Sequence, residues 1–160
     1  MDDQRYKELF VNVTDLLRED LKAGDNVVFV DDFAGTGNHV CQAWVNDMAE
    51  LLPGGPKTFL LLVAASSAAR QAISQATNLT VARSIELTEA DTIFSEHCPH
   101  FDAGEKTAML AYCKKADKRI PKGYGECGFV IVFAHRCPNN TIPILHANHD
   151  KWIGLFRRHH

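Results

Sequence analysis

Apolar positions in the first half of the chain switch between helical spacing and short continuous runs. Three segments carry apolar side chains three or four positions apart, which predicts amphipathic helices: residues 6–21, 40–52 and 68–76. Either Ser66 or Ser67 can cap the third helix. Two runs are apolar throughout, which is typical of buried strands: "VVFV" at 27–30 and "FLLLVAA" at 59–65.

The second half of the chain has a looser pattern. Residues 79–87 alternate apolar and polar side chains, which predicts a half-covered strand, and residues 88–103 are irregular. A helix is expected over 105–118. The run "GFVIVFA" at 128–134 predicts another buried strand, and residues 141–145 predict one more short extended piece.

This alternation of helices and strands predicts one α/β domain over residues 1–160. We expect a mostly parallel sheet of four to five strands flanked by helices, a Rossmann-like architecture. Ligands of such sheets bind beyond the carboxyl ends of the strands, near the point where the strand order reverses. Residues 31–38 follow the first predicted strand and are expected at that point.

The stretch "DDFAGTGN" has the residue types of a site for a phosphorylated sugar. Glycines let backbone amides at the start of a helix approach an anion, which predicts a phosphate-binding loop of Ala34, Gly35, Thr36, Gly37 and Asn38. Carboxylates repel phosphate, so Asp31 and Asp32 need ribose hydroxyls or Mg²⁺ as partners. No catalytic residue is assigned.

Other nucleotide motifs match this loop less well. It lacks the lysine of a P-loop, and Val40 replaces the third glycine of the dinucleotide pattern. "DDFAGTG" resembles the S-adenosylmethionine turn DPFxGxG of amino-methyltransferases, with Asp32 in place of proline, but the chain has no Pro-Pro pair for their second motif. A methyltransferase-like domain stays an alternative, as does a non-catalytic interaction module that retains the fold.

Two blocks carry a closer resemblance. "VVFVDDFAGTGN" resembles the type I phosphoribosyltransferase motif, in which an apolar strand leads into two acids and a small, hydroxyl-rich loop. The stretch 123–145, "GYGECGFVIVFAHRCPNNTIPIL", with Trp152 after it, resembles the phosphoribosyltransferase-like domain of bacterial conflict and defence systems, PRTase-CE. The resemblance covers about residues 25–157 in outline.

The resemblance implies roles for specific residues. Asp31 and Asp32 would hold ribose hydroxyls, with Mg²⁺ as a candidate cofactor, and residues 34–38 would surround the 5′-phosphate. A second wall of the site would come from Tyr124, His135, Arg136, Asn139 and Asn140. The loop Pro138-Asn139-Asn140-Thr141 receives no role of its own. The implied partners are a ribose-phosphate or nucleotide ligand and proteins of a defence system.

Catalysis has less support in the sequence than binding. A working phosphoribosyltransferase needs an earlier strand and loop for pyrophosphate and a hood over the site. Here one predicted helix precedes the strand that leads to Asp31, as expected either of the C-terminal part of a longer domain or of a reduced domain. If the protein is active, we expect glycosyl transfer from 5-phosphoribosyl 1-pyrophosphate (PRPP) or a nucleotide.

Composition narrows the partners and the location. Seventeen Lys and Arg against 20 Asp and Glu give a net charge of −3, which argues against a broad nucleic-acid surface. No apolar run reaches the roughly 20 residues of a membrane span, and the N-terminus has no signal features, so a cytoplasmic protein is expected. Five cysteines without a CxxC pair indicate reduced thiols, and His97, Cys98 and His100 are too few for zinc.

Overall fold

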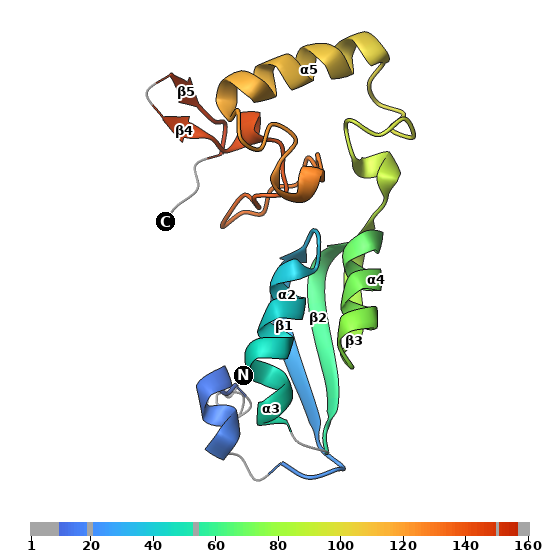
Figure 1. The fold of residues 1–160 in the computed structure, drawn as a ribbon, viewed down its shortest axis with the longest axis vertical. Coiled ribbons are helices and arrows are strands. Elements are labelled where there is room, and N and C mark those ends of the chain that lie inside the picture. The colour runs from blue at the N-terminus through green and yellow to red at the C-terminus, as the bar shows by residue number, and fades with distance from the viewer. Residues whose placement is uncertain (1–9, 19–20, 53–54, 150, 157–160) are drawn as a thin grey trace, which may run out of the picture.

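The computed structural model describes residues 10–18, 21–52, 55–149 and 151–156. The elements fall into two groups, one around a parallel sheet and one around a long helix (Figure 1). The sheet has three strands in the order β1-β2-β3: β1 (Asn26–Ala34), β2 (Lys57–Ser66) and β3 (Thr80–Leu87). The sequence predicted an α/β domain with a parallel sheet, and this is confirmed, but the sheet is smaller than the four to five strands expected.

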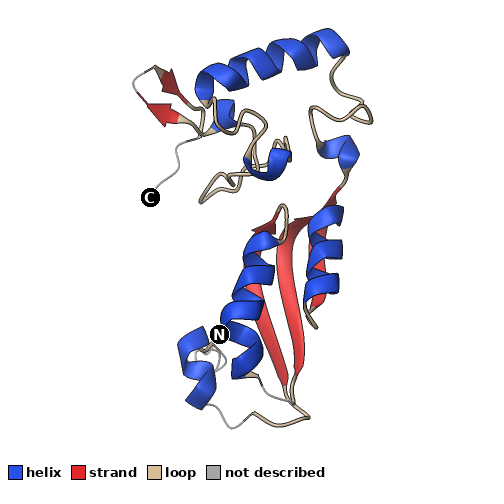
Figure 2. Ribbon diagram, viewed as in Figure 1, coloured by secondary structure: helices blue, strands red, loops and turns tan. Residues whose placement is uncertain are grey.

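Helices cover one face of the sheet. A helical run connects β1 to β2: α2 (Asn38–Ala43), the π-helical turn η2 (Trp44–Met48) and α3 (Ala49–Leu51). Helix α4 (Ser67–Ala76) connects β2 to β3. Because the strands are added in chain order, both connections lie on the same face (Figure 2). The order does not reverse within the described strands, so the expected position of residues 31–38 at a reversal point is wrong.

The first core lies between the sheet and these helices. Its buried members include Trp44, Leu60, Leu62 and Ile73. The opposite face of the sheet carries apolar side chains that no described segment covers fully: Val28, Val30, Leu61 and Val63 are between 42% and 71% exposed. The continuous apolar runs had predicted strands buried on both faces, and only one face is buried here.

The second group of elements is built mainly from loops around one helix. In chain order they are η3 (Glu89–Asp91), α5 (Ala103–Ala116), η4 (Tyr124–Glu126), η5 (Pro143–Leu145), β4 (Asn148–His149) and β5 (Trp152–Ile153). Asp102 caps α5 through a capping box with Glu105. A second core packs beneath α5 and includes Ile93, Cys113 and Ile142.

The predicted strand at 128–134 does not form. Gly128 has a left-handed backbone (φ 61°), and Phe129 makes only isolated bridges, to Thr92 and Thr141. The carbonyl of Ile131 accepts a hydrogen bond from the Thr141 hydroxyl at 2.7 Å, in place of a neighbouring strand. Side-chain hydrogen bonds of this kind compete with a sheet ladder. The expected extended piece at 141–145 is also wrong, since that segment contains η5.

The remaining expectations have mixed outcomes. The helices predicted at 40–52, 68–76 and 105–118 are present with shifted ends, and Ser66 is the cap of α4. The strand predicted at 79–87 and the irregular segment after it are present too. Much of the helix predicted at 6–21 lies outside the described residues, and the described part holds a 3-10 helix, η1 (Val13–Arg18). No described helix is long and apolar enough to cross a membrane.

Candidate functional site

A cavity of about 560 Å³, lined by both polar and apolar atoms, opens at the carboxyl end of β1. One side is formed by Asp31, residues 33–40 and Gln42, and the other by Tyr124, Arg136 and residues 138–140. These two stretches lie far apart in the sequence. The structure therefore gathers Asp31, the whole predicted phosphate loop and four of the five second-wall residues around one space. His135, the fifth, contacts Asp32 instead.

Ser66 fixes the loop at the start of this cavity. Its hydroxyl donates a 2.6 Å hydrogen bond to the carbonyl of Gly35 and accepts one from the backbone N–H of Ala69 at 2.8 Å. The helical run after the loop begins at Gly37 without a side-chain cap. The Thr36 hydroxyl accepts the backbone N–H of Asn38 at 3.3 Å. The backbone N–H groups of His39 and Val40, next in the first turn, have the electrostatics of an anion site.

The two loop glycines serve packing as well as access. Gly37 is buried with φ 78°, and a Cβ there would lie 2.9 Å from the carbonyl oxygen of Ala69 and 3.1 Å from Ile73. Residue 37 therefore faces α4, whereas the sequence interpretation had both glycines making room for a ligand. At Gly35 a Cβ would collide with the side-chain amide of Asn140.

Asn140 joins the second wall to the loop. Its side-chain nitrogen donates to the Tyr124 carbonyl at 3.0 Å and lies 3.4 Å from the Cys127 sulfur. The residue is 6% exposed. Gly125 packs in turn on the Thr36 methyl group, with no room for a side chain. These contacts hold Tyr124 at the rim of the cavity, where the residue is 43% exposed rather than packed in a core.

The two adjacent acids have different surroundings. Asp32 is 11% exposed and takes part in three hydrogen bonds, two from Arg136 (2.5 and 2.7 Å) and one with His135 (2.7 Å). Asp31 is 39% exposed, lines the cavity, and lies 3.5 Å from the Arg136 guanidinium. One Asp31 oxygen also accepts the backbone N–H of Asp32. Both acids lie inside β1, near its carboxyl end, and Arg136 Nη2 lies within 3.5 Å of an oxygen of each.

Arg136 and Asp32 stabilise each other's charge. Partial burial favours the neutral form of Asp32, but hydrogen bonds from Arg136 and His135 together favour the carboxylate more, so its pKa lies below the ordinary value. The hydrogen bond to Asp32 is the main reason that the pKa of Arg136 is raised. The pair is therefore fully ionised near neutral pH.

Aromatic rings dock the same C-terminal segment onto β1. Phe33 packs edge-on against Phe129 and lies at the same 6.1 Å centroid distance from Phe133. Phe133 lies 5.8 Å from the His135 ring. The apolar residues that predicted a strand at 128–134 thus supply rings that hold the second wall beside the acids.

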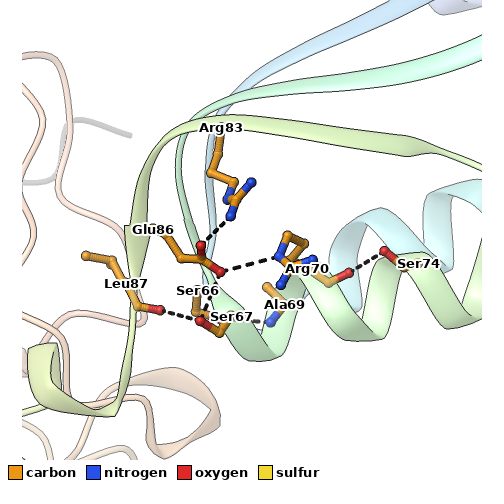
Figure 3. A network of polar contacts seen from close by, with 8 residues as sticks. All are labelled: Ser66, Ser67, Ala69, Arg70, Ser74, Arg83, Glu86 and Leu87. Carbon is orange, nitrogen blue, oxygen red and sulfur yellow. Dashed lines mark hydrogen bonds and ion pairs between the residues drawn. The ribbon is translucent and has the colours of Figure 1, made fainter.

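A separate charged network surrounds the start of α4 (Figure 3). Glu86 accepts hydrogen bonds from Arg83, Ser67 and Arg70. The contact with Arg83, followed by that with Ser67, lowers the pKa of Glu86. Glu86 therefore pairs with both arginines, and the network links β3 to α4.

Several lining residues have no signal in the sequence. Phe33, His39, Gln42 and Pro138 also border the cavity. The sequence does indicate Ser66, because a serine between a buried strand and a helix predicts a cap, but its hydrogen bond to Gly35 depends on tertiary structure.

His97 pairs with Glu89 at 3.3 Å, and Cys98 is buried. Among the described residues, no three His, Cys, Asp or Glu side chains gather so as to hold a metal ion.

The fold is consistent with a phosphoribosyltransferase-like α/β domain, with an acid pair near the end of a parallel strand and a glycine-containing loop after it. A family model described as PRTase-CE matches residues 2–158. The chain therefore belongs to the PRTase-CE family, as its sequence resemblance indicated. No curated protein and no solved structure shows significant similarity to it.

Proposed function

We propose that this PRTase-CE domain binds a ribose 5-phosphate group, free or within a nucleotide, in the cavity at the end of β1. The observation that carries the proposal is the convergence of an uncapped helix start, the exposed carboxylate of Asp31 and the second wall around one 560 Å³ space. The volume suits a small phosphorylated sugar or a nucleotide.

The ligand groups follow from the chemistry of each wall. The phosphate lies against the first turn of the helical run, at the backbone amides of His39 and Val40, where the partial positive charge of the helix start favours it. Ribose hydroxyls donate to the carboxylate of Asp31, which is 39% exposed and lines the cavity. Asn139 and Tyr124 border the opposite side.

Mg²⁺ would fit this site only together with the ligand. Both oxygens of Asp32 already accept hydrogen bonds, so Asp31 is the carboxylate that could contribute a metal ligand. Mg²⁺ commonly takes one or two carboxylates and completes its shell with ligand phosphates and water. It would then neutralise phosphate charge close to Asp31.

Calorimetric titration tests the proposal directly. Ribose 5-phosphate, PRPP, nucleoside monophosphates and S-adenosylmethionine are titrated separately, each with and without Mg²⁺. We expect the phosphorylated riboses to bind and Asp31→Asn to weaken them about tenfold or more, because a carboxylate that accepts two ribose hydroxyls is lost. Asp47→Asn is the matched control, since Asp47 is exposed and does not line the cavity.

Three other results of the titration would contradict the proposal. Binding of S-adenosylmethionine alone would favour the methyltransferase-like alternative. No binding of any titrant by a folded protein would favour an interaction module. Equal weakening by Asp31→Asn and Asp47→Asn would place the ligand elsewhere.

A role in bacterial defence is the wider part of this proposal, and family membership supports it. Cells carrying the gene in its native context are challenged with phage, with the Asp31→Asn variant beside the wild type. Protection that depends on Asp31 is the expected result, and unchanged infection in both strains would contradict it.

A further inference from the structure

We propose that the C-terminal end of helix α5 is a binding surface for single-stranded nucleic acid. The surface is a basic patch of five side chains: Lys114, Lys115, Lys118, Arg119 and Lys151. None of them lines the cavity at the end of β1. The inference goes beyond the proposed function and does not depend on it.

The charge of the chain is unevenly distributed. Residues 114–122 contain five Lys and Arg and one Asp, although the whole chain has a net charge of −3. By contrast, residues 86–105 contain six Asp and Glu and no Lys or Arg. A local positive field is therefore present on a chain whose total charge argues against a broad nucleic-acid surface.

The charges of the patch are not neutralised within the described part of the chain. Lys114, Lys115 and Lys118 are exposed, and none of them forms an ion pair with a described carboxylate. Arg119 is 90% exposed and meets Asp117 at 3.5 Å, and an exposed pair of this kind contributes little stability. Lys114 and Lys115 lie in the last turn of α5, where cations complement the helix dipole. That role does not account for Lys118 and Arg119, which follow the helix.

Tertiary structure adds a second segment to the patch. The Nε2 atom of His149 in β4 lies 2.9 Å from the carbonyl oxygen of Ala116, the last residue of α5. Strands β4 and β5 therefore lie beside this end of the helix (Figure 1). The turn between them carries Lys151, which is exposed. Basic residues that are far apart in the sequence thus meet at one end of α5.

An exposed aromatic ring favours nucleic acid over other polyanions. Tyr112 is 54% exposed, and the Lys115 Nζ lies over its ring, 5.1 Å from the centroid. Proteins that bind single strands without sequence preference combine basic side chains with rings on which bases stack. An acidic protein segment would use the charges of the patch but not the ring.

An anionic membrane is a weaker match to the patch. Membrane-bound surfaces place large apolar side chains among their lysines. Within residues 103–122, all of them described, Tyr112 is the only exposed large apolar side chain. Ile153 is exposed too, but it lies next to Trp152, the pairing partner of His149, and successive strand residues point to opposite faces. Ile153 is therefore on the face of β5 that points away from α5.

Binding to such a small patch should be weak and strongly dependent on salt. Four or five phosphate contacts to a single strand predict a slope of about −3 for the logarithm of the binding constant against the logarithm of salt concentration. The dissociation constant should be on the order of 10 μM near physiological salt.

Fluorescence anisotropy of the full chain tests the lysines. Labelled oligouridylate and oligothymidylate of about 12 nucleotides are titrated between roughly 50 and 200 mM salt, and binding of either strand supports the proposal. Lys118→Gln should weaken binding about threefold to fivefold and make the slope shallower by about 0.7, since one phosphate contact is lost. Lys114→Gln, Lys115→Gln and Lys118→Gln together should weaken it more than about tenfold.

Lys57→Gln is the matched control for a single charge. Lys57 is exposed and is the first residue of β2, which begins at the end of the molecule opposite to α5 (Figure 1). This variant should change neither the affinity nor the slope. Circular dichroism and thermal unfolding establish that each variant is folded.

Tyr112 separates stacking from charge. Tyr112→Ala should weaken binding about fivefold or more at an unchanged salt slope, since one stacked base is lost while the phosphate contacts remain. Tyr112→Phe keeps the ring and should bind as the wild type does.

Four results would overturn the inference. The first is no binding of either strand by the folded wild type at about 50 mM salt. The second is an equal loss for Lys57→Gln and Lys118→Gln, which would mean that only the total charge matters. The third is unchanged binding by Tyr112→Ala, and the fourth is tighter binding of polyglutamate or phosphatidylserine vesicles than of either strand. The titrations with ribose 5-phosphate are independent of all four, so each proposal can fail without the other.

Discussion

The side-chain amide of Asn140 lies directly on the backbone of Gly35, so a Cβ at position 35 would come within 2.5 Å of Oδ1 and 2.6 Å of Nδ2. This contact joins the phosphate loop to the second wall of the cavity. Asn140 can keep its hydrogen bond to the Tyr124 carbonyl only because residue 35 has no side chain. A larger residue at position 35 would push Asn140 away from that carbonyl.

Gly35→Ala should therefore lower the free energy of unfolding by about 1–3 kcal/mol, the usual range for overpacking. Asn140→Ala should also destabilise the protein, since a hydrogen bond to Tyr124 is lost. The double variant should be more stable than the sum of the single effects predicts, because the shortened side chain at position 140 makes room for the new methyl group. Urea unfolding of the four proteins measures this, and strict additivity would contradict the contact.

Gly37 is expected to be required for folding rather than for ligand access alone. Gly37→Ala should cost about 1–3 kcal/mol, since its left-handed backbone and its contact with Ala69 both disfavour a side chain. Gly24→Ala is the matched control, because nothing lies within 4 Å of a Cβ there. Equal midpoints of thermal unfolding for the two variants would contradict the packing of this loop on α4.

The pair of Asp32 and Arg136 should make stability depend on pH. Since the pKa of Asp32 is lowered on folding, its contribution is present above the unfolded pKa of about 4 and disappears as the pH falls below it. At pH 6 the free energy of unfolding of the wild type should exceed that of Asp32→Asn by about 1–3 kcal/mol. This difference should shrink towards pH 3. Denaturant unfolding across this range gives the difference. A difference in unfolding free energy that grows as the pH falls would contradict this prediction.

Neighbouring leucines of β2 should respond differently to truncation. Leu62 is 4% exposed in the first core, so Leu62→Ala should cost about 2–4 kcal/mol. Leu61 is 42% exposed on the open face, so Leu61→Ala should cost less than about 1 kcal/mol. Similar losses at both positions would mean that something covers the open face in solution.

Thiol reactivity should follow burial. Three cysteines are buried (Cys98, Cys113 and Cys137), and burial raises the pKa of Cys113 to about 11. None of the five, all within the described residues, forms a disulfide. In native protein near pH 7.5, a maleimide should react only at Cys41 and Cys127, and slowly at Cys127, whose pKa burial also raises. All five should react after unfolding without reductant. Mass spectrometry counts the adducts, and rapid native labelling of Cys113 would contradict its burial.

The sequence by itself determined the elements whose signals are local. Apolar runs placed β1 and β2, helical spacing placed the run at 38–51 and α4, and the serine before α4 predicted its cap. The loop proposed to bind phosphate could be predicted for the same reason, since glycines, a threonine and two acids near a strand end are adjacent along the chain. Family membership also followed from two short blocks.

Tertiary structure decided what depends on contacts between distant segments. The run at 128–134 has the composition of a strand, yet side-chain and loop hydrogen bonds satisfy its backbone and its rings pack on Phe33. Asp31 and Asp32 are equivalent in the sequence, and only the approach of Arg136 and His135 gives them different surroundings. The physical reason is the same in both cases: a local pattern fixes which residues are apolar or charged, but the partner that satisfies each of them is set by the folded chain.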